Sequence, residues 1–222
     1  MPEGRASSWD RALFLNATFW GAEEGGDVLV DASLPADVVT HVAWHRLAAK
    51  ALSSPKTKPS VAALFLGESI ASAFDLYLVG RILGHAPKSS FLTTQVLAMA
   101  ETAEAAGLDE IGFAELLGSL ADAPEESFAS LLELLLSATE ALFASLHAEA
   151  ALEVVTGLES HRFGPLLHRY DLATWILYAR AYGDPEASTK VSQVRRSLRD
   201  AKDPLQWLTD SWVLPALGQP RR

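Results

Sequence analysis

The sequence predicts an all-α fold: a single-domain bundle of seven to eight helices with a short N-terminal extended or β segment. Alanine and leucine supply 36 and 35 of the 222 residues, and both are strong helix formers. Glycine, proline and capping residues divide the chain into stretches that suit helices better than strands. Hydrophobic residues make up 49% of the chain, which is enough to build a core without disulfides or a metal.

We expect one domain spanning all 222 residues, in three parts. Residues 1–33 form the N-terminal extended segment. Within it, residues 27–31 are a short β-branched run bounded by turn residues and are predicted to form a strand, whereas residues 13–20 fit either a helical turn or a strand. Residues 34–84 hold the helix pair that carries a candidate metal site, and residues 85–222 hold the remaining helices.

The helices are placed by their start and stop signals. They are predicted over residues 36–53, 61–83, 90–106, 109–120 and 122–156, and three more begin near Pro165, Pro185 and Pro204. Ser60 is expected to cap the second helix, and Asp184 and Asp203 to cap helices whose first residue is proline. The fifth helix would be about 50 Å long at about 1.5 Å per residue, so we allow for a bend or break within it.

The formal net charge is −10, and it is unevenly distributed. Residues 89–161 carry 13 acidic side chains and no lysine or arginine, whereas residues 162–222 carry 10 basic and 6 acidic ones. An anionic surface repels the phosphate backbone, so no nucleic-acid partner is expected. The basic C-terminal side chains are expected to dock on the acidic middle of the chain, with an anion as the alternative ligand; they are Arg195, Arg196, Arg199 and Lys202.

Several classes of protein are excluded by what the sequence lacks. The absence of cysteine excludes a disulfide framework, a Cys-ligated zinc site and an iron–sulfur cluster. There is no apolar run of signal-peptide length, and no stretch approaches about 18 uncharged apolar residues, so we expect a cytoplasmic protein without a membrane partner. The motifs of P-loop ATPases, α/β-hydrolases and dinucleotide-binding dehydrogenases are missing as well.

Two histidines lie on one face of the first predicted helix. His41 and His45 are four residues apart, so their imidazoles lie one turn from each other, and Asp37 lies a turn earlier on the same face. Two nitrogens at this spacing can reach a single metal ion at about 2.0–2.1 Å each. The first helix is therefore a candidate for one half of a metal site.

The next helix carries acidic residues within an apolar sequence. Glu68, Ser72 and Asp75 fall at i, i+4 and i+7 and share a face, whereas most of their neighbours are alanine, leucine, isoleucine or phenylalanine. Buried carboxylates need partners, because an unpaired one is costly to desolvate. The connection between the two helices is short and bounded by prolines, so the helices should pack antiparallel as neighbours. The two histidines and Glu68 are therefore expected to meet across the interface.

This pattern resembles the gluzincin branch of zinc metallopeptidases, the thermolysin-like proteins. The similar features are His41-x-x-x-His45 and, 22 residues later, Gly67-Glu68-Ser69-Ile70-Ala71-Ser72-Ala73-Phe74, preceded by the predicted strand at residues 27–31. Members of that family carry an HExxH motif on one helix and a third zinc ligand, a glutamate, on the following helix. The resemblance covers roughly residues 27–83, little more than a quarter of the chain.

The resemblance implies roles for individual residues. It implies that His41, His45 and Glu68 are the ligands of Zn(II). It also implies that Asp75 orients a ligand imidazole through a hydrogen bond and so fixes its tautomer, and we place Asp37 beside it as a second residue of this kind. Because two histidines and one carboxylate also suit Fe(II), iron is the alternative metal.

The sequence departs from the family at one position that matters for activity. Val42 follows the first histidine, where the family has its general-base glutamate. Without this proton acceptor, peptide hydrolysis is expected to be slower by several orders of magnitude. The sequence therefore predicts a metallopeptidase-like helical protein with a His/His/Glu metal site and without peptidase activity.

Two alternative functions remain open. In the first, the histidines only hydrogen-bond neighbouring acids, and the protein is a non-enzymatic helical scaffold or interaction protein. In the second, an atypical di-metal carboxylate site forms from Glu68, Glu101, Glu140 and His147.

Other side-chain groups are assigned structural roles. A cluster that could bind a phosphate or carboxylate is more simply a set of salt bridges with the acidic segment; it comprises His161, Arg162, His168, Arg169 and Asp171. Leucines of the 122–156 helix and the stripe of Trp175, Tyr178 and Tyr182 are assigned to the core. An apolar stripe left exposed after folding would mark the interface of a homodimer. Substrate, pathway and other partners are not indicated.

Overall fold

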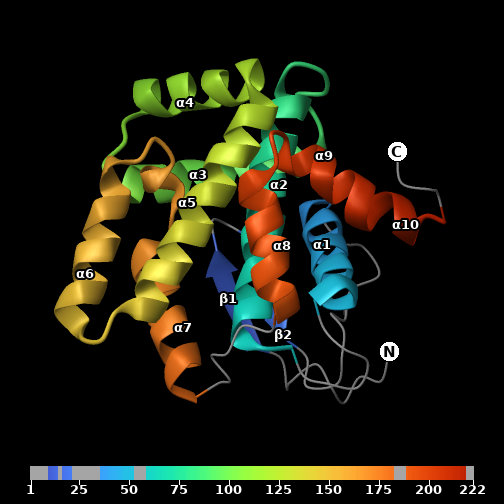
Figure 1. The fold of residues 1–222 in the computed structure, drawn as a ribbon. Coiled ribbons are helices and arrows are strands. Elements are labelled where there is room, and N and C mark those ends of the chain that lie inside the picture. The colour runs from blue at the N-terminus through green and yellow to red at the C-terminus, as the bar shows by residue number, and fades with distance from the viewer. Residues whose placement is uncertain (1–9, 15–16, 22–35, 53–58, 183–188, 219–222) are drawn as a thin grey trace, which may run out of the picture.

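A computed structural model describes residues 10–14, 17–21, 36–52, 59–182 and 189–218. Helices dominate these residues (Figure 1). They are α1 (Ala36–Leu52), α2 (Val61–Leu83), α3 (Ser90–Ala105), α4 (Glu110–Asp122), α5 (Pro124–Ala144), α6 (Ala148–Gly157), α7 (Arg169–Tyr182), α8 (Thr189–Asp200), α9 (Pro204–Leu208) and α10 (Leu214–Ala216), with 3₁₀ turns at Leu158–Ser160 and Gly164–Leu166 and a π-helical turn at Thr209–Val213. The predicted helical fold class is confirmed, and α1 to α8 each have ten or more residues.

The N-terminal part of the described chain is a two-stranded antiparallel sheet. Strands β1 (Asp10–Phe14) and β2 (Ala17–Gly21) pair with Leu13 opposite Thr18. The sequence left helix and strand open for residues 13–20; of these, residues 13–14 and 17–20 are in strands, and residues 15–16 lie outside the described residues. Strand β1 contacts α7, whereas β2 contacts α1 and α2. The strand predicted at residues 27–31 lies outside the described residues.

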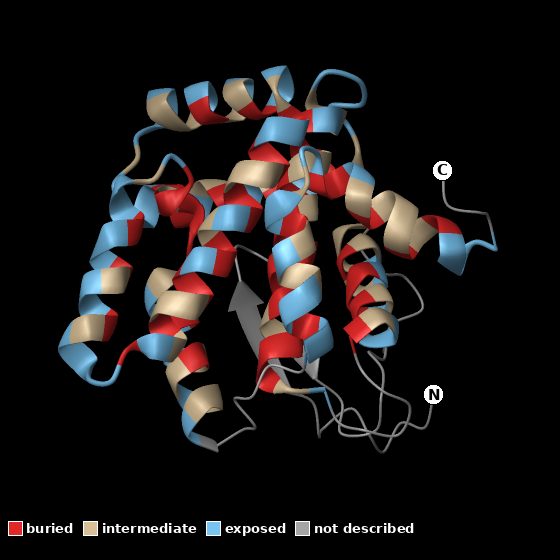
Figure 2. Cartoon of the chain, viewed as in Figure 1, coloured by how far each residue is buried: buried red, intermediate tan, exposed pale blue. Residues whose placement is uncertain are grey.

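Helices α2 and α5 form the centre of the bundle. Helix α2 contacts α1, α3, α4, α5 and α8, and the buried residues concentrate along these two helices and the faces turned toward them (Figure 2). Both helices are long and apolar enough, by length and composition, to cross a membrane. However, 72% of the most apolar 18-residue stretch of α2 and 50% of that of α5 are buried within the fold. The predicted leucine stripe lies in the core; its members are Leu131, Leu132, Leu135, Leu136 and Leu142.

Several helices begin at the residues that the sequence indicates. Ser60 caps α2 by accepting a hydrogen bond from the backbone N–H of Ala63. Asp109 caps α4 in the same way, and Asp203 caps α9 with Pro204 at the first helical turn. Such caps satisfy amide groups that have no partner within the helix. The proposed start at Asp184-Pro185 lies outside the described residues.

The long helix predicted over residues 122–156 is broken between α5 and α6. Ser145 is extended, and the imidazole of His147 caps α6 by accepting from the N–H of Ala150. The guanidinium of Arg180, on α7, donates to the carbonyl oxygens of Leu142, Phe143 and Ser145. The free carbonyls at the end of α5 are thus satisfied by a distant side chain.

Two expectations about the α7 region are wrong. Gly164 and Pro165 open a 3₁₀ turn, and α7 begins only at Arg169. The chain is tightly packed here, since a Cβ on Gly164 would lie 2.3 Å from the carbonyl oxygen of Leu158. The predicted aromatic stripe is also not the core face of α7: Tyr178 is 60% exposed and Trp175 is half-buried, whereas Leu172 and Ile176 are buried. The Tyr182 side chain lies outside the described part of the structure.

The expected docking of the basic C-terminal region on the acidic middle is confirmed at two arginines. Arg195 of α8 pairs with Glu140 of α5 at 3.0 Å. Arg199 pairs with Glu140 at 2.8 Å and with Glu133 at 3.0 Å, and it donates to Ser137. Helix α8 is therefore held against α5 by a charge network at the protein surface. The other two basic residues of the prediction, Arg196 and Lys202, are exposed.

Candidate metal centre

The candidate site lies between α1 and α2, which are antiparallel as predicted. His41 of α1 contacts Asp75 of α2, and His45, one turn later, contacts Glu68, about two turns earlier. Trp44 packs against Phe74 in the same interface, with ring centroids 5.0 Å apart. An apolar surround thus encloses two imidazoles and two carboxylates.

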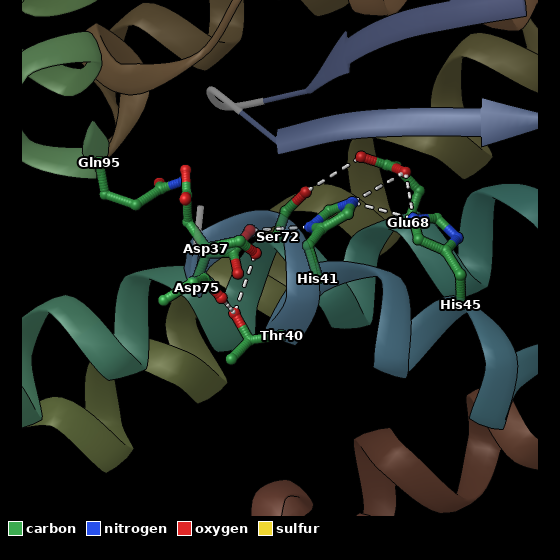
Figure 3. A network of polar contacts seen from close by, with 9 residues as sticks. Asp37, Thr40, His41, His45, Glu68, Ser72, Asp75 and Gln95 are labelled. Atoms are coloured by element: carbon green, nitrogen blue, oxygen red, sulfur yellow. Dashed lines mark hydrogen bonds and ion pairs between the residues drawn. The ribbon is translucent and has the colours of Figure 1, made fainter. Parts of the chain in front are cut away.

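Three potential ligand atoms converge at this interface (Figure 3). The Nε2 atoms of His41 and His45 are 2.9 Å apart. Oε2 of Glu68 lies 3.2 Å from Nε2 of His45 and 3.7 Å from Nε2 of His41. All three side chains are nearly inaccessible, with relative exposures of 3% for His41, 9% for His45 and 2% for Glu68. Within the described residues this is the one group of three or more histidines and acids that could hold a metal ion.

The spacing of these atoms fits a metal ion. A tetrahedral centre with bonds of about 2.0–2.1 Å separates its ligand atoms by about 3.3 Å. The three observed separations, 2.9, 3.2 and 3.7 Å, bracket this value. The donor set of two imidazoles and one carboxylate suits Zn(II) and Fe(II).

Asp75 holds His41 from the side opposite the converging atoms. Its Oδ2 lies 2.8 Å from Nδ1 of His41, and both side chains are buried. A proton on Nδ1 donated to this carboxylate leaves the lone pair of Nε2 directed toward His45 and Glu68. The other oxygen of Glu68, Oε1, accepts a hydrogen bond from Ser72 at 3.4 Å.

Asp37 lies at the edge of this group (Figure 3). Its Oδ2 accepts a hydrogen bond from Nε2 of Gln95, a buried residue of α3, at 3.2 Å, and its negative charge acts on Asp75. Sequence reasoning missed Gln95, because the residue lies 58 positions away and nothing local marks it. A buried glutamine on an otherwise apolar helix face is the signal that could have identified it.

The electrostatics of the site follow from burial and close pairing. Burial by itself lowers the pKa of His41, but the carboxylates of Asp75 and Glu68 outweigh it and raise the pKa to about 10. Burial by itself raises the pKa of Glu68, whereas His41 and His45 lower it to about 2. For Asp75 burial prevails and the pKa is raised, although His41 opposes this change. Without a metal, His41 is therefore protonated at neutral pH, and the neighbouring acids balance its positive charge.

The other candidate groups do not assemble a metal site. Glu140 is engaged by Arg195 and Arg199, and His147 is at the exposed start of α6, so the di-metal arrangement with Glu68 and Glu101 does not form. Around the 3₁₀ turns, two of the predicted salt bridges with the acidic segment are present. Arg162 lies 3.9 Å from Glu126, and Arg169 lies 2.8 Å from Glu159. His161 makes no such pair with an acid in this contact; its Nε2 lies 3.5 Å from the hydroxyl of Ser130.

The position of the family's catalytic glutamate carries an apolar side chain. Val42 is half-buried on α1 next to His41. No protein-family model, curated protein or solved structure matches this chain. The resemblance to zinc metallopeptidases thus stands on the residues of the α1–α2 pair alone.

Proposed function

We propose that this protein is a metallopeptidase-like metal-binding protein without peptidase activity. His41, His45 and Glu68 would hold one Zn(II) ion per chain, with Fe(II) as the alternative. The observation that carries the proposal is the convergence of Nε2 of His41, Nε2 of His45 and Oε2 of Glu68 at the separations of a tetrahedral centre.

The surrounding residues support this use of the site. The Asp75 carboxylate accepts from Nδ1 of His41, which is the arrangement that fixes the tautomer of a metal-binding histidine. Ser72 holds the carboxylate of Glu68 from its other oxygen. The ligands come from two packed helices rather than from loops, so their spacing is set by the fold.

A bound metal ion would supply Lewis acidity at this interface. What the chain itself does not supply is a proton acceptor at Val42, since a valine side chain cannot take up a proton. Among the described residues, the remaining buried acid next to the histidines is Asp75, and its Oδ2 is already engaged by His41. Peptide hydrolysis therefore lacks its general base, and the proposed role is to bind the metal rather than to cleave peptides.

The experiment is a metal titration of the untagged protein, paired with a peptidase assay. Wild type should bind about one equivalent of Zn(II), His45→Ala should bind much more weakly, and the exposed His85→Ala should behave as wild type. Casein and peptide libraries should not be cleaved in the presence of zinc. Turnover that disappears in His41→Ala would contradict the absence of peptidase activity.

A structural polar network is the second candidate function, and one observation favours it. The raised pKa of His41 makes it a cation between Asp75 and Glu68, which gives both carboxylates an opposite charge without a metal. The protein would then be a helical scaffold or interaction protein. A wild type that binds no Zn(II) or Fe(II) in the titration supports this function instead.

A further inference from the structure

We infer that Gly67 is a positioning residue for the metal centre: its missing side chain lets α1 and α2 approach closely enough at Ala48 for the three ligand atoms to converge. The inference rests on the proposed function and extends it to a residue that contacts no metal. Its basis is the packing of the two helices beside the ligands, not the chemistry of the ligands themselves.

The close approach is visible next to the ligands in both helices. A Cβ built on Gly67 would lie 3.0 Å from the Cβ of Ala48, closer than two methyl groups normally pack. Gly67 immediately precedes Glu68, and Ala48 follows His45 by one helical turn. The contact point therefore lies next to the ligand pair with the 3.2 Å separation, Nε2 of His45 and Oε2 of Glu68.

Gly67 has no other evident reason to be a glycine. Glycine inside a helix is unfavourable relative to alanine, because it loses more conformational freedom on folding. Gly67 is buried in the interior of α2, where its φ is not in the left-handed region, so the backbone conformation does not require glycine. What requires it is the nearness of α1.

The consequence for a metal ion follows from how narrow its bond lengths are. Metal–ligand distances vary by only about 0.2 Å in well-formed sites. An added methyl at Gly67 must push Ala48 and its helix away by a few tenths of an ångström. This displacement moves His45 away from Glu68, because they lie on opposite helices, but it removes none of the three ligand side chains. Binding should weaken although the ligand set is complete.

The experiment is a methyl exchange between the two helices, measured by metal affinity. Gly67→Ala should weaken Zn(II) binding about tenfold or more, the range seen when residues that orient ligands are changed. The double variant Gly67→Ala/Ala48→Gly moves the methyl to the other side of the same contact and should restore binding to near the wild-type value. Gly118→Ala is the matched control, because a Cβ there meets no atom within 4 Å.

Two further readouts separate a positioning role from a general packing role. The melting temperature of each metal-free variant reports packing, and the visible spectrum of the Co(II)-loaded protein reports coordination geometry. Gly67→Ala should change the Co(II) spectrum while the metal-free melting temperature changes little, since its better helix propensity offsets the crowded contact. If Gly67→Ala does not fold, Ala48→Ser presses on the same contact from α1 and should also weaken binding.

Each result decides the inference. Zn(II) affinity of Gly67→Ala equal to that of wild type overturns it and leaves the proposed function intact. A loss that the exchange variant does not restore also overturns it, because the cause is then not this contact. A wild type that binds neither Zn(II) nor Co(II) overturns the proposed function and the inference together.

Discussion

Two interfaces of this protein join helices through charged side chains, and they use charge in opposite ways. Between α5 and α8 the paired side chains are partly exposed, from 16% for Arg195 to 52% for Glu133. Between α1 and α2 the pair of His41 and Asp75 is 3% and 2% exposed. Water solvates and screens the charges of the first network. The charges of the second are shielded from water, so only the paired side chains stabilise them.

The difference indicates that the buried charges between α1 and α2 serve a role other than stability. Replacing a buried ion pair by apolar residues of similar size is often neutral or stabilising, so a bundle with this much leucine and alanine does not need one. The network between α5 and α8, in contrast, joins segments of opposite charge, and this pairing is enough to explain why its residues are charged.

Loss of His41 should be the most damaging change. His41→Ala leaves Asp75 and Glu68 buried without their cation, and breaking a buried pair in this way costs about 3–5 kcal/mol. Urea denaturation measures the loss in the free energy of unfolding, and the exposed His85→Ala provides the baseline. A loss below about 1 kcal/mol would mean that the buried network behaves like a surface one.

Changing the residue behind the ligand should affect metal binding more than folding. Asp75→Asn keeps the shape of the side chain but removes the charge that supports His41, so Zn(II) affinity should fall about 10- to 100-fold. Isothermal titration of wild type and variant gives the ratio. Asp37→Asn, whose closest partner is Gln95, should change the affinity less. The reverse order would assign the supporting role to Asp37.

The stability of the metal-free protein should depend on pH through the buried network. The folded pKa of His41, about 10, lies above its ordinary value of 6.5, so its stabilisation is complete below about pH 6.5 and is lost as the pH rises toward 10. Glu68, with a folded pKa of about 2, stabilises above pH 4.5 and loses this contribution as the pH falls toward 2. The raised pKa of Asp75 acts in the same direction as that of His41.

Unfolding measured across pH in the presence of chelator tests this dependence. The free energy of unfolding should fall on the alkaline side by up to about 1.4 kcal/mol per pH unit for each proton involved. His41→Ala should flatten that side, whereas His85→Ala should not. An unchanged alkaline slope in His41→Ala would show that another group is responsible.

The smallest effect is expected at the surface network. Arg199→Ala removes the pairs with Glu133 and Glu140, and exposed pairs contribute about 0.2–1 kcal/mol each. The loss should shrink at high salt, because exposed charges are screened. Comparing wild type and variant at low and high ionic strength measures both effects. A salt-independent loss would indicate that the aliphatic part of Arg199 contributes through packing instead.

The site could be predicted from sequence to the extent that its geometry is local. The four-residue spacing of His41 and His45, and the acids spaced along the next helix, became neighbours because a short connection makes the two helices antiparallel. Gln95 could not be predicted as the partner of Asp37, since it reaches the site from α3 through the fold of the whole bundle.

The features of the fold that could be predicted from sequence are likewise the local ones. Helix starts at Ser60, Asp109 and Asp203 were predictable, because a cap is a local hydrogen bond. The break between α5 and α6 has neither glycine nor proline, and its free carbonyls are satisfied by Arg180 from α7, far along the sequence. The stripe containing Tyr178 had the spacing of a core face, but neighbouring helices cover Leu172 and Ile176 instead.

The most direct test of a metal centre between α1 and α2 is elemental analysis of untagged protein purified without chelator. About one Zn(II) or Fe(II) per chain is expected in wild type, and close to none in a His45→Ala preparation handled in parallel. Treatment with chelator should then lower the melting temperature of wild type alone. A wild type that carries no metal, and whose melting temperature is the same with and without chelator and added zinc, would contradict a metal centre between α1 and α2.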